Sequence, residues 1–180
     1  MPESYNQNFN HLKIHTQYSI CEGALKIDDL QDFSKSNKIK SLALCDTSNL
    51  CGALEFAEKI SKVGTQPIIG TQINFKYGDC IGLLPLFALN EEGYKRIIKL
   101  SSTSYLENDE LSDPHINFND LLEDNTGVAV FSGTIFGLFG ELFNKGKFSE
   151  ISELYKKLKF KFGDRFYIEI QRHNDLCISI

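Results

Sequence analysis

The sequence lacks the marks of several protein classes. Its five cysteines are odd in number and form no C-x-x-C pair, which argues against both a disulfide framework and a structural zinc knuckle. No apolar run approaches the roughly 20 residues of a membrane helix, and the first residues carry neither a basic leader nor an apolar targeting core. We therefore expect a soluble, cytoplasmic protein with reduced thiols, including Cys45 and Cys51 as small core residues.

The sequence also lacks a positive charge balance and the common nucleotide-binding motifs. A net charge of −5 has the wrong sign for a domain that binds nucleic acid by itself, so any DNA would be held by other parts. The sequence contains no G-x-G-x-x-G, no P-loop and no G-x-S-x-G motif. These motifs are typical of dinucleotide-binding proteins, P-loop phosphate-transfer enzymes and α/β-hydrolases, so their absence argues against these three classes. The 180 residues suit one domain, which can bury about 70% of its unfolded surface.

Hydrophobic periodicity predicts strands that alternate with helices. The predicted strands cover residues 11–15, 41–46, 66–75, 81–89, 127–133 and 165–171. The predicted helices cover residues 27–37, 49–63, 90–105, 119–122, a piece ending at 143, and 148–161. We expect residues 1–8 to be loose and residues 106–114 to form an acidic, mobile surface loop. This order is typical of a parallel α/β barrel or a doubly wound sheet.

Two local features refine this prediction. Pro85 interrupts the fourth predicted strand, which indicates a bulge or an edge position. In the second predicted helix, four apolar residues recur at helical spacing and are expected to face the core. They are Leu50, Leu54, Ala57 and Ile60.

The segment HLKIHTQYSICEG combines a short alternating strand with a polar turn. In a strand, His11, Lys13 and His15 share one face. The turn then places Glu22 at the carboxyl edge of the sheet, where α/β folds carry their sites. Asp46 ends the next, apolar strand and is expected at the same edge. Two imidazoles at this spacing can bind a transition metal, but a lysine cannot. The pattern therefore indicates a metal site in which Lys13 has replaced one ligand.

Six segments, taken in order, resemble the N-terminal PHP (polymerase and histidinol phosphatase) domain of bacterial DNA polymerase III alpha subunits. They are HLKIHTQYSICEG, LALCDTSNLCGALEF, QPIIGTQINF, FALNEEGYKRIIKLSS, GVAVFSG and FYIEIQRH. The resemblance implies a distorted (β/α)7 barrel over residues 9–180, incomplete at its C-terminus. The palm, thumb and fingers of the polymerase would then be absent, and the chain would be a fragment. Because an incomplete barrel exposes a hydrophobic strand edge, we expect this fragment to be unstable alone.

Active members of this family hold up to three metal ions, which clamp the attacking and leaving oxygens in phosphoester hydrolysis. Compared with that pattern, this sequence has lost most of the ligands. The positions replaced are occupied by Lys13, Thr47, Gln72, Leu83 and Thr134. The vestigial candidates are His15, Glu22, Asp46 and His173, while the final Asp and His ligands would lie beyond Ile180.

Lys13 suggests what replaced the metal. An ammonium within about 4 Å of Asp46 or Glu22 gains roughly 4 kcal/mol at an effective dielectric near 20, before desolvation is subtracted. We therefore expect Lys13 to stand in for a cation between these carboxylates. Structural alternatives stay open: His15 and Asp46 share a hydrogen bond, and His11 is a strand histidine bonded to backbone. In this structural interpretation, His115 and His173 are surface residues.

Two functions follow from the resemblance. In the first, the chain is a structural and protein-docking module of the polymerase III alpha subunit, which other holoenzyme subunits, including the proofreading exonuclease, contact. It would then bind no cofactor and have no catalytic residue, whereas the parent polymerase uses Mg²⁺ and holds DNA through domains absent here. In the second, it is a metal-dependent phosphoesterase, a 3′–5′ exonuclease or phosphatase with Zn²⁺ or Mn²⁺. The replaced ligands favour the first.

Overall fold

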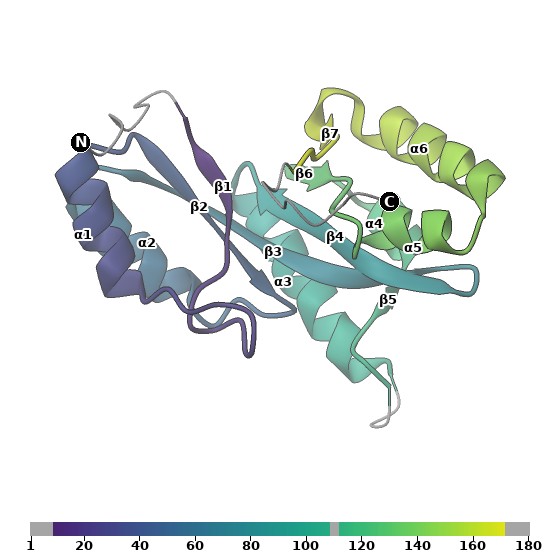
Figure 1. Ribbon diagram of the computed structural model, residues 1–180, viewed down its shortest axis with the longest axis horizontal. Coiled ribbons are helices and arrows are strands. Elements are labelled where there is room, and N and C mark those ends of the chain that lie inside the picture. Colours follow the sequence, from purple (N-terminus) through teal and green to yellow (C-terminus); the bar gives the residue numbers. More distant parts are fainter. Residues whose placement is uncertain (1–8, 109–111, 172–180) are drawn as a thin grey trace, which may run out of the picture.

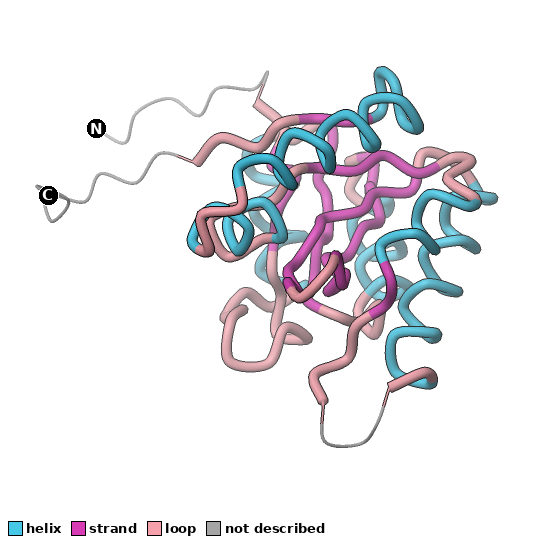
Figure 2. Tube along the Cα trace, turned by 90° about the vertical axis from the view of Figure 1, so that its right-hand side faces the viewer, coloured by secondary structure: helices cyan, strands magenta, loops and turns pink. Residues whose placement is uncertain are grey.

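The computed structural model describes residues 9–108 and 112–171 and shows a mixed α/β fold built on one curled sheet. Helices surround the sheet, with α1 and α2 at one end and α5 and α6 at the other (Figures 1 and 2). The strands are β1 (His11–Ile14), β2 (Ser41–Thr47), β3 (Gln66–Tyr77), β4 (Cys80–Ala88), β5 (Ile116–Asn117), β6 (Val128–Phe131) and β7 (Phe166–Tyr167). The helices are α1 (Ile27–Asn37), α2 (Ala53–Lys62), α3 (Glu91–Leu106), α4 (Phe118–Glu123), α5 (Leu138–Asn144) and α6 (Phe148–Phe162).

The first half of the sheet is parallel, as predicted. Strand β2 pairs with β1 on one side and with β3 on the other, and both pairings are parallel. Residues 42–46 of β2 are completely buried, because the strand has a neighbour on each side and its side chains face α1 and α2 or the inside of the curl. The prediction of a strand buried on both faces is therefore confirmed.

The second half of the sheet mixes antiparallel and parallel pairings, and here the prediction of a wholly parallel sheet is wrong. Strands β3 and β4 form an antiparallel hairpin, because only Gly78 and Asp79 connect them and a two-residue loop cannot cross to a parallel neighbour. Gly78 supplies the positive φ of 62° that such a turn requires. Strand β6 is antiparallel to β4, and β7 is parallel to β6. The order β1-β2-β3-β4-β6-β7, with β5 on β3, makes a partial barrel, which confirms the predicted fold class.

Strand β4 also corrects the expectation for its proline. The pairing with β3 runs without interruption from Cys80 to Phe87, so Pro85 causes no bulge. Strand β6 pairs only with Leu86–Ala88, which leaves Pro85 one residue beyond that pairing. The missing N–H of Pro85 therefore removes no bond to β6. The alternative prediction of an edge position is wrong as well, because β4 lies between β3 and β6 in the sheet.

Helix α2 starts later than predicted and presents a different face. The Asn49 side chain donates to the carbonyls of Tyr18 and Thr47 and holds a turn before the helix. The helix consequently begins at Ala53, and its buried face consists of Ala53, Phe56 and Ile60. Leu54, predicted to face the core, is 72% exposed.

Three further expectations need correction. Strand β7 covers two residues instead of seven. Its start is set by a 3-10 turn at residues 163–165, in which the Arg165 guanidinium donates to the carbonyls of Asn125 and Val128. Beyond Tyr167, the backbone N–H of Glu169 donates to the Ser132 side chain instead of to a strand carbonyl. Cys51 is exposed and is no core residue, whereas Cys45 is buried. The two-residue strand β5 was not predicted at all.

Several predictions fall on residues that the structure leaves undescribed. Residues 1–8, 109–111 of the acidic loop, His173 and Cys177 lie outside the described ranges. No helix within the described ranges is long and apolar enough to cross a membrane.

Buried apolar side chains form three groups. The first-half cluster joins β1, α1, β2 and α2, and includes Leu30 and Phe56. The second-half cluster joins β3, β4, β6 and β7 to α3, α4, α5 and α6, and includes Leu154. A small central cluster contains Ala43, Cys45, Phe87 and Ala129. The molecule therefore has two apolar cores joined by one continuous sheet.

Candidate functional site

A pocket of about 460 Å³ opens where the predicted site residues meet. Six of the positions singled out from the sequence line it, although they come from β1, the turn after it, β3, β4 and the loop before α5. They are Lys13, His15, Glu22, Gln72, Leu83 and Thr134. Gly133, Phe136, Gly137 and Gln171 complete the lining. The structure thus brings these six positions to one pocket, whereas His11, which was expected on the same face as Lys13 and His15, does not line it.

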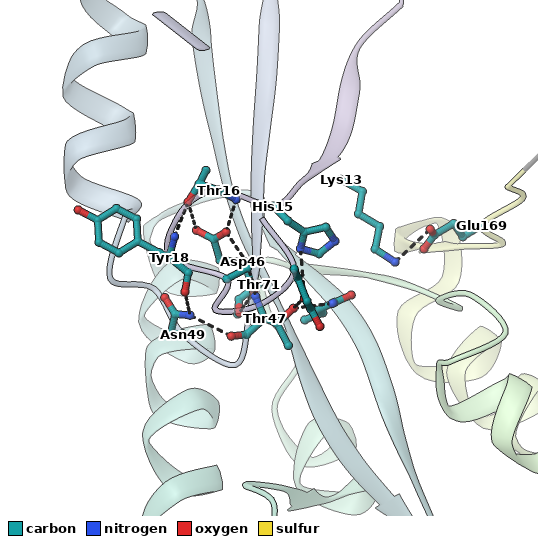
Figure 3. Close-up of polar contacts among 12 residues, drawn as sticks. Lys13, His15, Thr16, Tyr18, Asp46, Thr47, Asn49, Thr71 and Glu169 are labelled. Atoms are coloured by element: carbon teal, nitrogen blue, oxygen red, sulfur yellow. Dashed lines mark hydrogen bonds and ion pairs between the residues drawn. The ribbon is translucent and has the colours of Figure 1, made fainter. Parts of the chain in front are cut away.

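Asp46 lies completely buried beside the pocket, with both carboxylate oxygens in hydrogen bonds (Figure 3). Oδ1 accepts from the backbone N–H of Thr16 at 2.6 Å and from Ser19 Oγ at 2.7 Å. Oδ2 accepts from Thr16 Oγ1 at 2.8 Å. These three donors satisfy a buried carboxylate and hold the polar turn after β1 against the end of β2. Asp46 thus acts as a structural anchor for that turn.

A second polar chain runs along one wall of the pocket. Thr47 Oγ1 donates to Glu22 Oε2, and Gln72 Nε2 donates to Thr47 Oγ1 at 2.7 Å. Two of the replaced ligand positions, Thr47 and Gln72, therefore serve to hold the surviving carboxylate of Glu22. The Thr47 hydroxyl can link the two side chains because it accepts a hydrogen bond from the Gln72 amide and donates one to the Glu22 carboxylate.

Lys13 does not bind the carboxylates that we predicted. Its Nζ lies 3.2 Å from Glu169 Oε1, so the expected pairing with Asp46 or Glu22 is wrong (Figure 3). Glu169 is held by the second half of the chain: its backbone N–H donates to Ser132 Oγ at 3.0 Å, and Gln171 Nε2 donates to its Oε1 at 2.7 Å. Sequence reasoning missed Glu169, although a charged residue between Ile168 and Ile170 in FYIEIQ was a signal.

His15 stands apart from these networks. Its Nδ1 is shielded from solvent, has no hydrogen-bond partner in the described part of the chain, and lies 3.9 Å from Glu22 Oε2. Burial lowers the pKa of His15, and the nearby Glu22 carboxylate opposes that shift. The predicted hydrogen bond between His15 and Asp46 is wrong, because the oxygens of Asp46 are occupied by Thr16 and Ser19.

The other two described histidines lie outside the pocket. The ring of His11 packs edge-on against Phe9, with 4.9 Å between centroids, and near Phe33. Burial lowers the pKa of His11. The β1–β2 register shifts between His11 and Ile14, which breaks the regular alternation that would have kept His11 in line with Lys13. His115 Nδ1 lies 2.8 Å from the Asp113 carbonyl in a surface loop.

The residues present do not fit the multi-metal cluster that the resemblance implies. Within residues 9–108 and 112–171, no group of three or more His, Cys, Asp or Glu side chains is placed to hold a metal ion. An ammonium, that of Lys13, stands at one ligand position, and the carboxylate of Asp46 is committed to three donors. Among the described pocket residues, only His15 and Glu22 are conventional metal ligands, and two ligands do not form a multi-metal site.

Comparison with known proteins decides the family. A model of the PHP domain family matches residues 11–173, almost the whole chain. The chain belongs to the PHP family. It is 35% identical over 186 residues to the DNA polymerase III subunit alpha of Caulobacter vibrioides, covering 96% of this chain and 16% of that protein. It is 38% identical over 167 residues to the corresponding subunit of Rickettsia felis, covering 92% of this chain and 14% of that protein.

The PHP chain therefore spans about one sixth of the length of the curated relatives that it matches. Among solved structures, it is similar to an amidohydrolase from Chromobacterium violaceum, with a TM-score of 0.44 and 18% identity. That alignment covers 53% of this chain and 32% of the amidohydrolase. A likeness of this degree says nothing about chemistry.

Proposed function

We propose that this chain is the PHP module of a replicative DNA polymerase III alpha subunit and that its former metal site now has a structural and protein-docking role. DNA synthesis and its Mg²⁺ ions would then belong to other parts of the parent polymerase. The family membership and the identity of 35–38% to alpha subunits support the first half of this proposal. The second half depends on the pocket.

One observation carries the structural role. The pocket's polar groups bind one another: Lys13 binds Glu169, Thr47 links Gln72 to Glu22, and Asp46 anchors the turn after β1. A hydrolytic PHP site must instead leave carboxylates and imidazoles free to face metal ions. These side chains are arranged to support the fold, so the vestigial candidates Glu22 and Asp46 are proposed as structural residues. His15, which takes no part in these networks, is proposed as a remnant of the former site.

The first test is elemental metal analysis of the intact protein that carries this domain, after exposure to Zn²⁺ and Mn²⁺ and removal of loosely bound ions. We expect well below one ion per PHP domain. Lys13→His, which restores a His-x-His pair with His15, should increase the Zn²⁺ affinity, whereas Lys95→His on the exposed face of α3 should not. Two or more ions per wild-type domain would overturn the proposal and would direct attention to phosphoester hydrolysis.

Exposed apolar residues at the pocket rim support the docking role. Ile135 and Phe136 are 70% and 74% exposed, and Phe136 lines the pocket. Large exposed apolar side chains beside a polar recess are typical of protein contacts. We propose that the proofreading exonuclease subunit of the same organism docks at this rim.

Titration of the purified exonuclease subunit onto the intact alpha subunit tests this docking. Phe136→Ser should weaken the complex by about tenfold or more, in the range of an interface anchor. The matched control is Phe160→Ser on α6, which removes an equally large and exposed ring outside the pocket and should leave the affinity unchanged. Equal affinities for wild type and Phe136→Ser would exclude this rim as the docking site.

A further inference from the structure

The Lys13–Glu169 ion pair joins the two edges of the sheet. Lys13 lies on β1, the first strand in the sheet order, and Glu169 follows β7, the last strand, by two residues. The two side chains point toward each other (Figure 3), and their charged ends are 3.2 Å apart. No backbone ladder connects β1 with β7 in the described structure, so this contact spans a gap that the sheet itself leaves open.

The Lys13–Glu169 pair is better shielded from water than an ordinary surface ion pair. The side chains of Lys13 and Glu169 are only 19% and 11% exposed, unlike the Lys95–Glu91 pair on α3, whose side chains are 70% and 79% exposed. Exposed pairs contribute little, because water screens them and two long side chains must be ordered. A shielded pair behaves differently, since removing one partner leaves the other charge without compensation.

Each partner is positioned by a different half of the molecule. Lys13 precedes Ile14 of the first-half cluster. Glu169 is held through its backbone by Ser132, directly after β6, and follows Phe166 of the second-half cluster. The pair therefore connects two separate apolar cores on the side where the sheet is open. Lys13 and Gln171 both contact Oε1 of Glu169, and Lys13 supplies the positive charge of this contact. The other oxygen, Oε2, is shielded and has no hydrogen-bond partner among the described residues.

We propose that Lys13 and Glu169 form a latch that holds the two edges of the curled sheet together over the pocket. Where the family uses metal ions to gather ligands from different strands, this chain uses one intramolecular ion pair. Breaking the latch separates β1 from the segment after β7 and gives solvent access to the inside of the curl, while both apolar cores stay folded. This inference does not depend on the polymerase assignment.

The chain contains its own reporters for this opening. Cys45 is completely buried in the central cluster, on the inside of the curl, with Ala43, Phe87 and Ala129. Burial raises the pKa of its thiol far above the usual value, so alkylation occurs only when the site opens. Cys80 is equally buried but belongs to the second-half cluster. Local unlatching exposes Cys45 alone, whereas global unfolding exposes both thiols.

The experiment is iodoacetamide labelling of the intact protein, with the rate at each cysteine followed by peptide mass spectrometry. Lys13→Met and Glu169→Gln should each accelerate labelling of Cys45 by roughly tenfold, with no change at Cys80. Electrostatics alone cannot mimic this result. Losing the lysine disfavours the thiolate of Cys45 and losing the glutamate favours it, so direct charge effects would have opposite signs.

The charge-swapped double variant Lys13→Glu with Glu169→Lys should recover most of the protection, and Lys95→Met serves as the control for an exposed pair. Unchanged Cys45 labelling in both single variants would overturn the latch. Equal acceleration at Cys45 and Cys80 would overturn it as well, because the pair would then stabilise the whole fold and not this opening. Failure of the polymerase assignment would leave the labelling results untouched.

Discussion

At the scale of single residues, Asp46 determines how the turn after β1 is held. Its carboxylate is completely buried and accepts three hydrogen bonds from Thr16 and Ser19. Asp46→Asn directs an amide N–H₂ at one of these donors and removes the charge that strengthens all three bonds. We expect the free energy of unfolding in urea to fall by about 2–3 kcal/mol. Asp29→Asn, on the exposed first turn of α1, is the isosteric control and should change it by less than about 0.5 kcal/mol.

The same residue shows what sequence patterns can predict. The position of Asp46 was predictable, because an apolar run that ends in an aspartate places this residue at the sheet edge beside His15, where both residues lie. Partners were not predictable. Asp46 binds Thr16 and Ser19 instead of His15 or Lys13, because hydrogen-bond choice depends on turn geometry that the local pattern does not encode. Glu169, 156 positions from Lys13, shows the same limit at long range.

At the scale of elements, the start of α3 is fixed by one side chain. Asn90 Oδ1 accepts from the backbone N–H of Gly93 at 2.9 Å, and the Gly127 carbonyl accepts from the N–H of Leu89 at 2.8 Å. Asn90→Ala leaves a helix N–H without its acceptor and should lower the free energy of unfolding by about 1 kcal/mol. Asn90→Asp keeps the acceptor and should retain most of the stability. An equal loss in both variants would show that the amide matters for reasons other than capping.

Elements with strong burial or capping signals were predicted well, and those determined by turns were not. The bounds of β2, α3 and α6 agree with the sequence-based prediction to within one or two residues. Strand β2 is marked by a buried apolar run, α3 by an asparagine cap and α6 by a long amphipathic stripe, and each of these patterns favours a single local structure. The direction of β4 depended on the loop Gly78–Asp79, and the start of α2 depended on the Asn49 side chain. A prediction made from periodicity alone ignores both.

At the scale of the whole molecule, the two apolar cores meet at Leu50. This half-buried side chain, in the turn before α2, packs against both the first-half and the second-half cluster. Leu50 belongs to the helix-covered cores and does not line the pocket. Leu50 is therefore the apolar counterpart of the ionic contact between the halves.

This placement predicts a distinctive effect on local stability. Leu50→Ala should lower the free energy of unfolding by about 1–3 kcal/mol, less than a fully buried leucine because part of the side chain is already in water. In hydrogen exchange, amides of α1 and of α6 should both lose protection. Leu30→Ala, confined to the first-half cluster, should act mainly on α1, and Leu154→Ala mainly on α6. If Leu50→Ala affected only one helix, the two cores would be independent at this point, and the continuous sheet alone would couple them.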